Sequence, residues 1–257
     1  MKKFRLSLAA LIILAAVSCT KTDSGVAATG TVTTDQVADI AAGSLATNSG
    51  GLATVTEDVA VNAQTLNSVS GGLTVNTISQ HQACGTTVTD SVSRTATEDS
   101  VTRNYFFKYS HTLNCNVNSQ PDNMVNALIY HGTFDGPRLT SSNSGSSTFT
   151  IAGLTTTAAN FVVNGEYKRA GTFQSKVGNK ASGSSNVDIV VTNLVLIKPT
   201  RKIASGSATI AITGTSPKGS FSYTGTIVFN ADSTALLTIN GIAYTINLTH
   251  GWCERHH

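Results

Sequence analysis

Apolar residues alternate with polar or small ones in four successive runs between residues 205 and 250. A period of two places successive side chains on opposite faces of a strand, so each run predicts a β-strand with one buried face. Asn240-Gly241 separates the last two runs, and this pair is a preferred centre for a two-residue type I′ hairpin turn. We therefore expect an antiparallel meander whose strands cover residues 208–212, 221–229, 237–239 and 242–248.

The same alternation recurs upstream, where strands are expected near 73–79, 86–94, 102–114, 123–133, 146–153, 159–168, 171–177 and 187–197. The connections, including polar loops at 140–147 and 180–186, are too short for crossover helices, so the strands pair antiparallel. A sheet of about twelve strands twists strongly. The prediction is a mainly-β fold built on one large, strongly curved antiparallel sheet, as a half-barrel, a barrel or a sandwich.

Two short helices are predicted before the strands. Thr33 and Gln36 have the spacing of a capping box, and apolar residues then recur at helical spacing, which predicts a helix over 34–47. Gly50 and Gly51 end this pattern, and a second helix is expected over 52–67. The two form a helical hairpin within residues 34–70, and its narrow apolar stripe has to dock on a face of the sheet formed by residues 73–250.

The first residues have the pattern of a secretion signal. A basic start is followed by an apolar stretch at 6–17 that is too short to span a bilayer, so residues 1–18 are predicted to be a signal peptide. Ala16-Val17-Ser18-Cys19 closes the stretch and resembles the lipobox of bacterial lipoproteins. In that family the cysteine is acylated, by palmitate among other chains, and becomes the first residue of the mature protein. The resemblance therefore implies lipidation at Cys19.

The serine before Cys19 and the abundance of Ser, Thr and Asn in the rest of the chain resemble lipoproteins of the Bacteroidetes type. Thr20, rather than an Asp, follows the cysteine, and in bacterial lipoproteins this implies delivery to the outer membrane, on either its periplasmic or its cell-surface face. Residues 19–33 are predicted to be a flexible tether, because they are polar and lack periodicity. Residues 34–257 are expected to form a single mainly-β domain, to which the resemblance does not extend.

Composition excludes two classes of protein. Charged residues make up 12% of the chain, about half the usual share, and the net charge is +3 without a basic cluster after residue 5. Nucleic acid is therefore not an expected partner. Intrinsic disorder is excluded because 40% of the residues are hydrophobic and occur in regular strand patterns.

The cysteines favour a disulfide over a metal site. Cys84 and Cys115 fall at the ends of neighbouring predicted strands, and thiol pairs outside the cytoplasm usually bridge, so we expect these two to pair and Cys253 to remain. The alternative is a zinc or copper site at the two H-x-x-C spacings. Because no C-x-x-C occurs and free thiolates are scarce outside the cytoplasm, no metal or other cofactor is expected. The candidates for that alternative are His81, Cys84, His250 and Cys253.

Catalysis finds little support in the sequence. Neither G-x-S-x-G, nor H-E-x-x-H, nor a Walker loop occurs. Glu166 and Asp188 are the only carboxylates in strand-rich context that suit a glycosidase pair, but acids at strand ends are usually solvated. The sequence therefore predicts no catalytic residue and a protein that is not an enzyme.

Two further sets of residues are candidates for binding or modification. Aromatic residues in the predicted strands line either the core, which is the commoner arrangement, or a ligand pocket. Three Asp-Ser pairs resemble the sequon for O-glycosylation in Bacteroidetes, which implies exposed loops. The candidate ligand-lining residues are Phe106, Tyr109, Phe221, Tyr223 and Phe229, and the candidate glycosylation sites are Ser91, Ser100 and Ser233.

These observations predict a non-catalytic, lipid-anchored envelope lipoprotein with a structural or binding role. Two alternatives stay open at this point. A carrier of lipid or another amphiphile needs an apolar face of the sheet that the helices leave uncovered. A surface-assembly subunit, such as an adhesin or a pilus-like protein, needs an exposed strand edge.

Overall fold

The computed structural model describes residues 32–65, 82–98 and 100–256. It contains one antiparallel sheet in which eleven strands follow one another in chain order, so each pairs with the next. This is the meander that the alternating pattern predicts. The strands are β1 (Thr87–Glu98), β2 (Val101–Cys115), β3 (Pro121–Asp135), β4 (Leu139–Ala152), β5 (Asn160–Ser175), β6 (Ser182–Ile197), β7 (Ile203–Ser216), β8 (Gly219–Phe229), β9 (Thr234–Ile239), β10 (Ile242–Asn247) and β11 (Cys253–Arg255).

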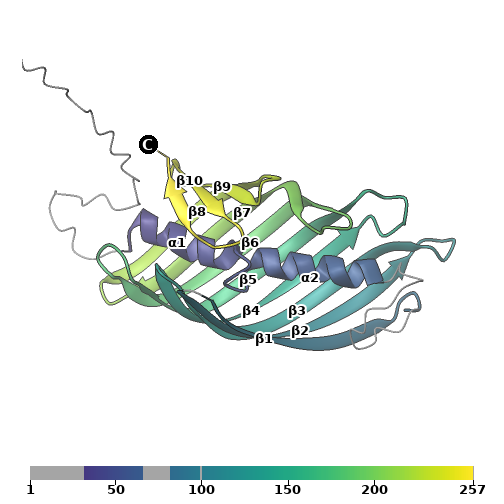
Figure 1. Cartoon of the computed structure of the whole chain (residues 1–257), viewed down its shortest axis with the longest axis horizontal. Coiled ribbons are helices and arrows are strands. Elements are labelled where there is room, and N and C mark those ends of the chain that lie inside the picture. The colour runs from purple at the N-terminus through teal and green to yellow at the C-terminus, as the bar shows by residue number, and fades with distance from the viewer. Residues whose placement is uncertain (1–31, 66–81, 99, 257) are drawn as a thin grey trace, which may run out of the picture.

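The sheet curls around the two helices without closing (Figure 1). Within the described ranges β1 and β11 are its two edges and do not pair with each other. Helices α1 (Thr34–Leu45) and α2 (Leu52–Thr65) lie in the concavity, one after the other. The expected mainly-β class with a curved sheet and an N-terminal helical hairpin is confirmed, in its half-barrel form. None of the described helices is long and apolar enough to cross a membrane.

Helix α1 is the centre of the fold. It begins with the predicted capping box, in which the Thr33 side chain accepts a hydrogen bond from the Gln36 amide at 3.3 Å and the Gln36 side chain accepts one from the Thr33 amide at 3.1 Å. All of its residues from Gln36 to Leu45 are buried. The reason is that α1 contacts β4 and β5 in the middle of the sheet and also β9, β10 and β11, which curl over it.

Glycines opposite aromatic residues allow the sheet to bend tightly around the helices. Tyr105 is the cross-strand partner of Gly132, and Tyr130 is the partner of Gly145. A Cβ atom added to either glycine would overlap the ring of its tyrosine. Because the glycines have no side chain, each ring can lie across the neighbouring strand and fill the concave side of the sheet. Glycines are common at strand positions where a sheet bends strongly.

The turn between β9 and β10 is confirmed, since Asn240 and Gly241 have φ values of 50° and 77°.

Two predicted loops were wrong: residues 140–147 lie within β4, and β6 already begins at Ser182, inside the loop predicted at 180–186. The strands predicted at 159–168 and 171–177 are one strand, β5. The first half of β4 shows no alternation of apolar and polar residues, because it carries Ser, Asn and Gly on both faces. Its concave positions face a buried polar network around Arg169 rather than apolar groups. The strand predicted at 73–79 lies outside the described residues.

Candidate binding cleft at the open side of the sheet

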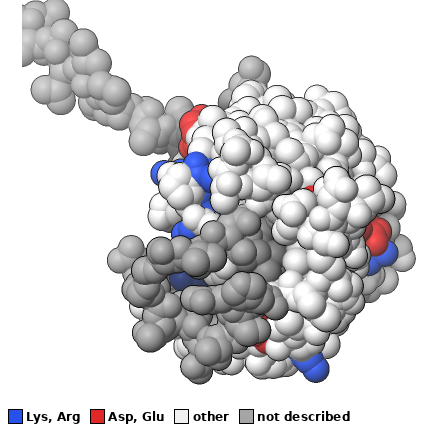
Figure 2. Space-filling model, turned by 90° about the vertical axis from the view of Figure 1, so that its right-hand side faces the viewer, with Lys and Arg blue, Asp and Glu red and all other residues white. Residues whose placement is uncertain are grey.

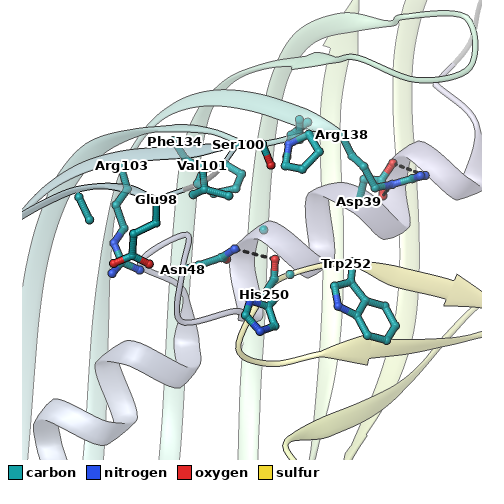
Figure 3. Close-up of a pocket in the computed structure, with 16 residues that line it drawn as sticks. Asp39, Asn48, Glu98, Ser100, Val101, Arg103, Phe134, Arg138, His250 and Trp252 are labelled. Atoms are coloured by element: carbon teal, nitrogen blue, oxygen red, sulfur yellow. Dashed lines mark hydrogen bonds and ion pairs between the residues drawn. The ribbon is translucent and has the colours of Figure 1, made fainter.

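A cleft of about 240 Å³ lies where the two edges of the sheet approach each other over the helices (Figure 3). One wall comes from the end of β1 and the start of β2, and a second from the turn between β3 and β4. The segment 250–252, after β10, forms the opposite side. Asp39 and Gly43 of α1 contribute to the floor. The cleft therefore combines four segments that are distant in the sequence.

The floor contains a buried ion pair. Arg138 donates from Nε to Asp39 Oδ1 at 2.7 Å and from Nη2 to Oδ2 at 3.1 Å. The Cys253 thiol donates to the same Oδ1 atom at 3.2 Å. Burial raises the pKa of Asp39, while the hydrogen bond and the charge of Arg138 act against this rise. These bonds attach the middle of α1 to the β3–β4 turn and to β11.

The walls of the cleft differ in chemistry. Val101 and Phe134 present an apolar wall, and the ring of Trp252, which is 44% exposed, stands across the cleft from them (Figure 3). Glu98 and Arg103 lie at one end of the cleft. A ligand with both apolar and polar parts would find a partner for each part here.

A second buried network joins the helices to the sheet below the cleft. Arg169 of β5 is buried and donates to the backbone oxygens of Gly43 and Ser49, at the end of α1 and in the loop after it. It also donates to the hydroxyl of Tyr105 at 3.0 Å and to Ser141 at 3.3 Å. Carbonyl groups at the end of a helix carry partial negative charge, which suits a buried guanidinium. Arg169 is thus a structural group that docks the helical hairpin.

A separate groove of about 370 Å³ lies between α2 and strands β1 and β2, and Arg103 lines both this groove and the cleft. Asp58 of α2 accepts hydrogen bonds there from Arg94 at 2.5 Å and from the Tyr109 hydroxyl. Burial, followed by the negative charge of Asp58, raises the pKa of Tyr109. The charged groups of this groove therefore connect α2 to the sheet.

The five aromatic candidates for ligand lining do not form one pocket. Phe106 lies on the convex face, where its ring is 5.4 Å from the His131 ring. The other four lie on the helix side, and their rings are part of, or packed against, the hydrophobic core. None of the five lines the cleft. The four residues on the helix side are Tyr109, Phe221, Tyr223 and Phe229.

The predicted disulfide is confirmed. Cys84 and Cys115 are bonded, with Cα atoms 5.6 Å apart, so Cys84 has no thiolate to offer a metal. Cys253 is buried against Asp39, and His250 is exposed at the rim of the cleft. In the described ranges no three His, Cys, Asp or Glu residues are arranged to hold a metal ion. His81, like Cys19, lies outside the described residues.

Glu166 and Asp188 come close together, but on the convex face. Lys168 lies 2.8 Å from Glu166 and 4.0 Å from Asp188, and all three side chains are about half exposed. The hydrogen bond from Lys168 lowers the pKa of Glu166, whereas burial and the charge of Glu166 raise that of Asp188. Lys168 thus links the two carboxylates into an ion-pair network at the surface. Neither carboxylate lines the cleft.

The candidate glycosylation sites occupy different surroundings. Ser91 is exposed on β1, and Ser100 is exposed just before β2. Ser233 is half-buried in the turn between β8 and β9, with φ of 62°. Ser91 is thus exposed on a strand rather than in an exposed loop, and modification at the three serines stays a prediction.

Charge is sparse on the folded body. On the face shown in Figure 2, charged side chains lie singly or in small groups among uncharged ones. Comparisons with protein-family models, with curated proteins and with solved structures found no match to this chain.

Proposed function

We propose that the protein is a lipid-anchored, non-catalytic lipoprotein of the outer membrane whose folded body has a binding role. The lipobox-like sequence that ends at Cys19 supports the anchor. Residues 20–31 separate Cys19 from Val32, which is buried and accepts a hydrogen bond from Tyr223 at 2.8 Å. A chain covers at most about 3.5 Å per residue, so the body would stay within about 45 Å of the lipid.

The contacts of the buried and half-buried ionisable groups support a non-catalytic role. Asp39, Asp58 and Arg169 each bind a partner that joins a helix to the sheet. His111 of β2 does the same, because its Nε2 lies 2.8 Å from Asn62 of α2. Groups held in this way stabilise the docked hairpin and are not poised toward a substrate.

The cleft is the observation that carries the proposed binding role. Its apolar wall at Val101 and Phe134 faces Trp252, while Glu98 and Arg103 offer charge at one end. We infer a small amphiphile as ligand, with its apolar part against the wall and its polar part near these charges. Pockets that enclose drug-sized ligands have about 300–1,000 Å³, so a cleft of about 240 Å³ would take a small amphiphile or one end of a larger one.

The concave face of the sheet is a less suitable site for a whole lipid. Both helices pack on it, and their apolar residues and those of the sheet form one buried cluster. A lipid between helices and sheet would have to displace this packing, which burial of apolar surface stabilises by about 25 cal/mol per Å².

The anchor is tested by replacing Cys19 with alanine in the full chain. We expect the variant to lose incorporation of labelled palmitate and to leave the membrane fraction, because acyl chains supply the binding energy for membranes. Thr20→Ala is the matched control and should keep both properties. Unchanged membrane association and labelling of Cys19→Ala would contradict the proposed anchor.

The binding role can be tested through Trp252, the sole tryptophan of the chain. Titration with octanoate, a small anionic amphiphile, should change its fluorescence saturably, and Phe134→Ala should weaken this binding about tenfold or more. Ile129→Ala, on the exposed convex face, is the control and should bind like the parent. A folded parent protein that shows no saturable change with octanoate or with a cationic analogue such as octylamine would overturn the proposed ligand class.

A further inference from the structure

The edge strand β1 has a sequence that is symmetrical in residue type about Val92. Reading outward from this valine, the same kind of residue follows in both directions, except that an acid on one side matches a base on the other. The matched pairs are Ser91 with Ser93, Asp90 with Arg94, Thr89 with Thr95, Val88 with Ala96, and Thr87 with Thr97.

The same strand is the exposed edge of the sheet. Every residue of β1 is half-buried or exposed, whereas the neighbouring strand β2 contains buried positions. Among the described residues only β2 pairs with it, so its outer side carries peptide groups without a strand partner. Such an edge is a template for another strand.

We propose that two copies of this chain associate through β1, as antiparallel strands related by a twofold axis at Val92. In that register Val92 faces the partner's Val92, and Asp90 faces the partner's Arg94. The Ser and Thr residues face one another on the convex side, and Val88 faces the partner's Ala96 on the helix side. The interface is self-complementary, as a twofold contact between identical patches has to be.

The side chains of Arg94 and Asp90 are partly exposed on β1, where they are accessible to the second copy. Arg94 binds Asp58 at 2.5 Å and its side chain is still 39% exposed. Asp90 lies 3.2 Å from His111 and is 42% exposed. In the dimer each would gain a second partner of opposite charge, and opposite charges on directly facing residues of antiparallel strands attract.

These charges also select the register. Charged residues that point inward usually protect an edge strand from pairing. A shift by one residue places the apolar side chains on the wrong face, and a shift to the next even register brings Asp90 against an apolar residue. Only the arrangement centred on Val92 matches both charges and the apolar residues, so the edge disfavours other strands while it accepts its own copy.

The size of the contact predicts its strength. A strand from residue 87 to 97 is about 36 Å long at 3.3 Å per residue. With a sheet about 10 Å thick, each copy buries on the order of 360 Å², which is less than the roughly 800 Å² per partner of stable complexes. The dimer is therefore weak and forms at high protein concentration.

Cysteine cross-linking tests the register. In the full chain carrying Cys19→Ser, Val92→Cys should give a disulfide-linked dimer under mild oxidation, because the two cysteines face each other. Ala96→Cys alone is the control and should cross-link at least tenfold less, while a mixture of Val88→Cys and Ala96→Cys should give the linked pair. Equal cross-linking of the Val92 and Ala96 variants, or none with Val92→Cys, would overturn the proposal.

A charge exchange tests the same interface without new cysteines. Asp90→Arg and Arg94→Asp should each weaken dimerisation at least tenfold in sedimentation equilibrium, because like charges then face each other twice. A mixture of the two variants should restore a heterodimer, since each charge again meets its opposite. Loss of an inner ion pair cannot explain such rescue, and circular dichroism checks that both variants fold. Dimerisation of the single variants like the parent, or no rescue in the mixture, refutes the twofold contact.

Discussion

Arg138, in the turn between β3 and β4, holds both carboxylate oxygens of Asp39 in the middle of α1, with N–O distances of 2.7 and 3.1 Å. The Asp39 side chain is only 2% exposed, and that of Arg138 is 22% exposed. Burial of an ionised carboxylate is costly unless a partner compensates it. The ion pair with Arg138 therefore stabilises the ionised form of Asp39 in α1, beneath the cleft.

Arg138→Ala should destabilise the protein by about 3 kcal/mol at pH 7, because it leaves a buried carboxylate without this counter-charge. The deficit depends on pH. Burial raises the pKa of Asp39 above its ordinary 3.8 in the folded state, and loss of Arg138 raises it further. Between the unfolded and the folded pKa the folded state holds more protons, so stability falls as pH rises through that range.

The deficit of the variant should therefore be largest at pH 7 and shrink toward pH 4. Urea unfolding of the parent and of Arg138→Ala at several pH values measures it. Lys218→Ala, in the exposed turn between β7 and β8, is the control and should stay within about 0.5 kcal/mol of the parent. A deficit that is constant over this pH range would refute the assigned role of the Asp39 charge.

Arg169→Leu should destabilise the fold by about 3 kcal/mol or more. The variant leaves the backbone oxygens of Gly43 and Ser49 buried without this donor, and each such group costs about 1–3 kcal/mol. Hydrogen exchange should then be faster in α1 and α2. Lys168→Leu changes the neighbouring residue on the convex face, which is 52% exposed, and should have little effect. Equal stability of the two variants would refute the docking role of Arg169.

The sequence predicted correctly those elements that depend only on interactions between residues close in the chain. The capping box at Thr33 and the turn at Asn240 depend on neighbouring residues, and both are present. The second half of β4 was predicted as a strand, but its Ser- and Asn-rich first half was taken for a loop, because the concave side there faces Arg169, a partner that is distant in the sequence. A pattern test assumes that the buried face is apolar, so it fails where a buried polar network replaces apolar packing.

The cleft was not predicted for a related reason. Its residues come from α1, the β1–β2 and β3–β4 turns and the segment after β10, and no spacing in the sequence connects them. Trp252 was the single visible signal, as an isolated aromatic residue near the C-terminus. The disulfide was predictable because Cys84 and Cys115 flank adjacent strands, so chain order alone brings them together.

The disulfide between Cys84 and Cys115 should stabilise the fold. Cys84 and Cys115 are separated by 31 positions, and closing a loop of this length lowers the entropy of the unfolded chain by the equivalent of about 3–4 kcal/mol. The double variant Cys84→Ala/Cys115→Ala should therefore unfold at a clearly lower temperature in calorimetry. Peptide mapping without reduction should join the two peptides in the parent. Cys253→Ala keeps this bridge and serves as control, and a parent that melts like the double variant would contradict the prediction.

Tyr105 packs against Gly132, its cross-strand partner, and substitution at the glycine tests whether the ring needs the space that the missing side chain leaves. A Cβ at Gly132 would overlap the Tyr105 ring and would also come too close to the backbone oxygen of Asn104. The Tyr105 hydroxyl also accepts from Arg169, so a shift of the ring disturbs that bond as well. Overpacking of this kind costs about 1–3 kcal/mol, although alanine suits a strand better than glycine does. Thr133→Ala, at the next and exposed position of β3, is the matched control. Because Tyr105→Leu removes the ring that the added Cβ would overlap, combining Gly132→Ala with Tyr105→Leu should cost less than the sum of the two single changes. Chemical unfolding of all four variants measures this coupling, and strict additivity would show that the glycine does not act through Tyr105.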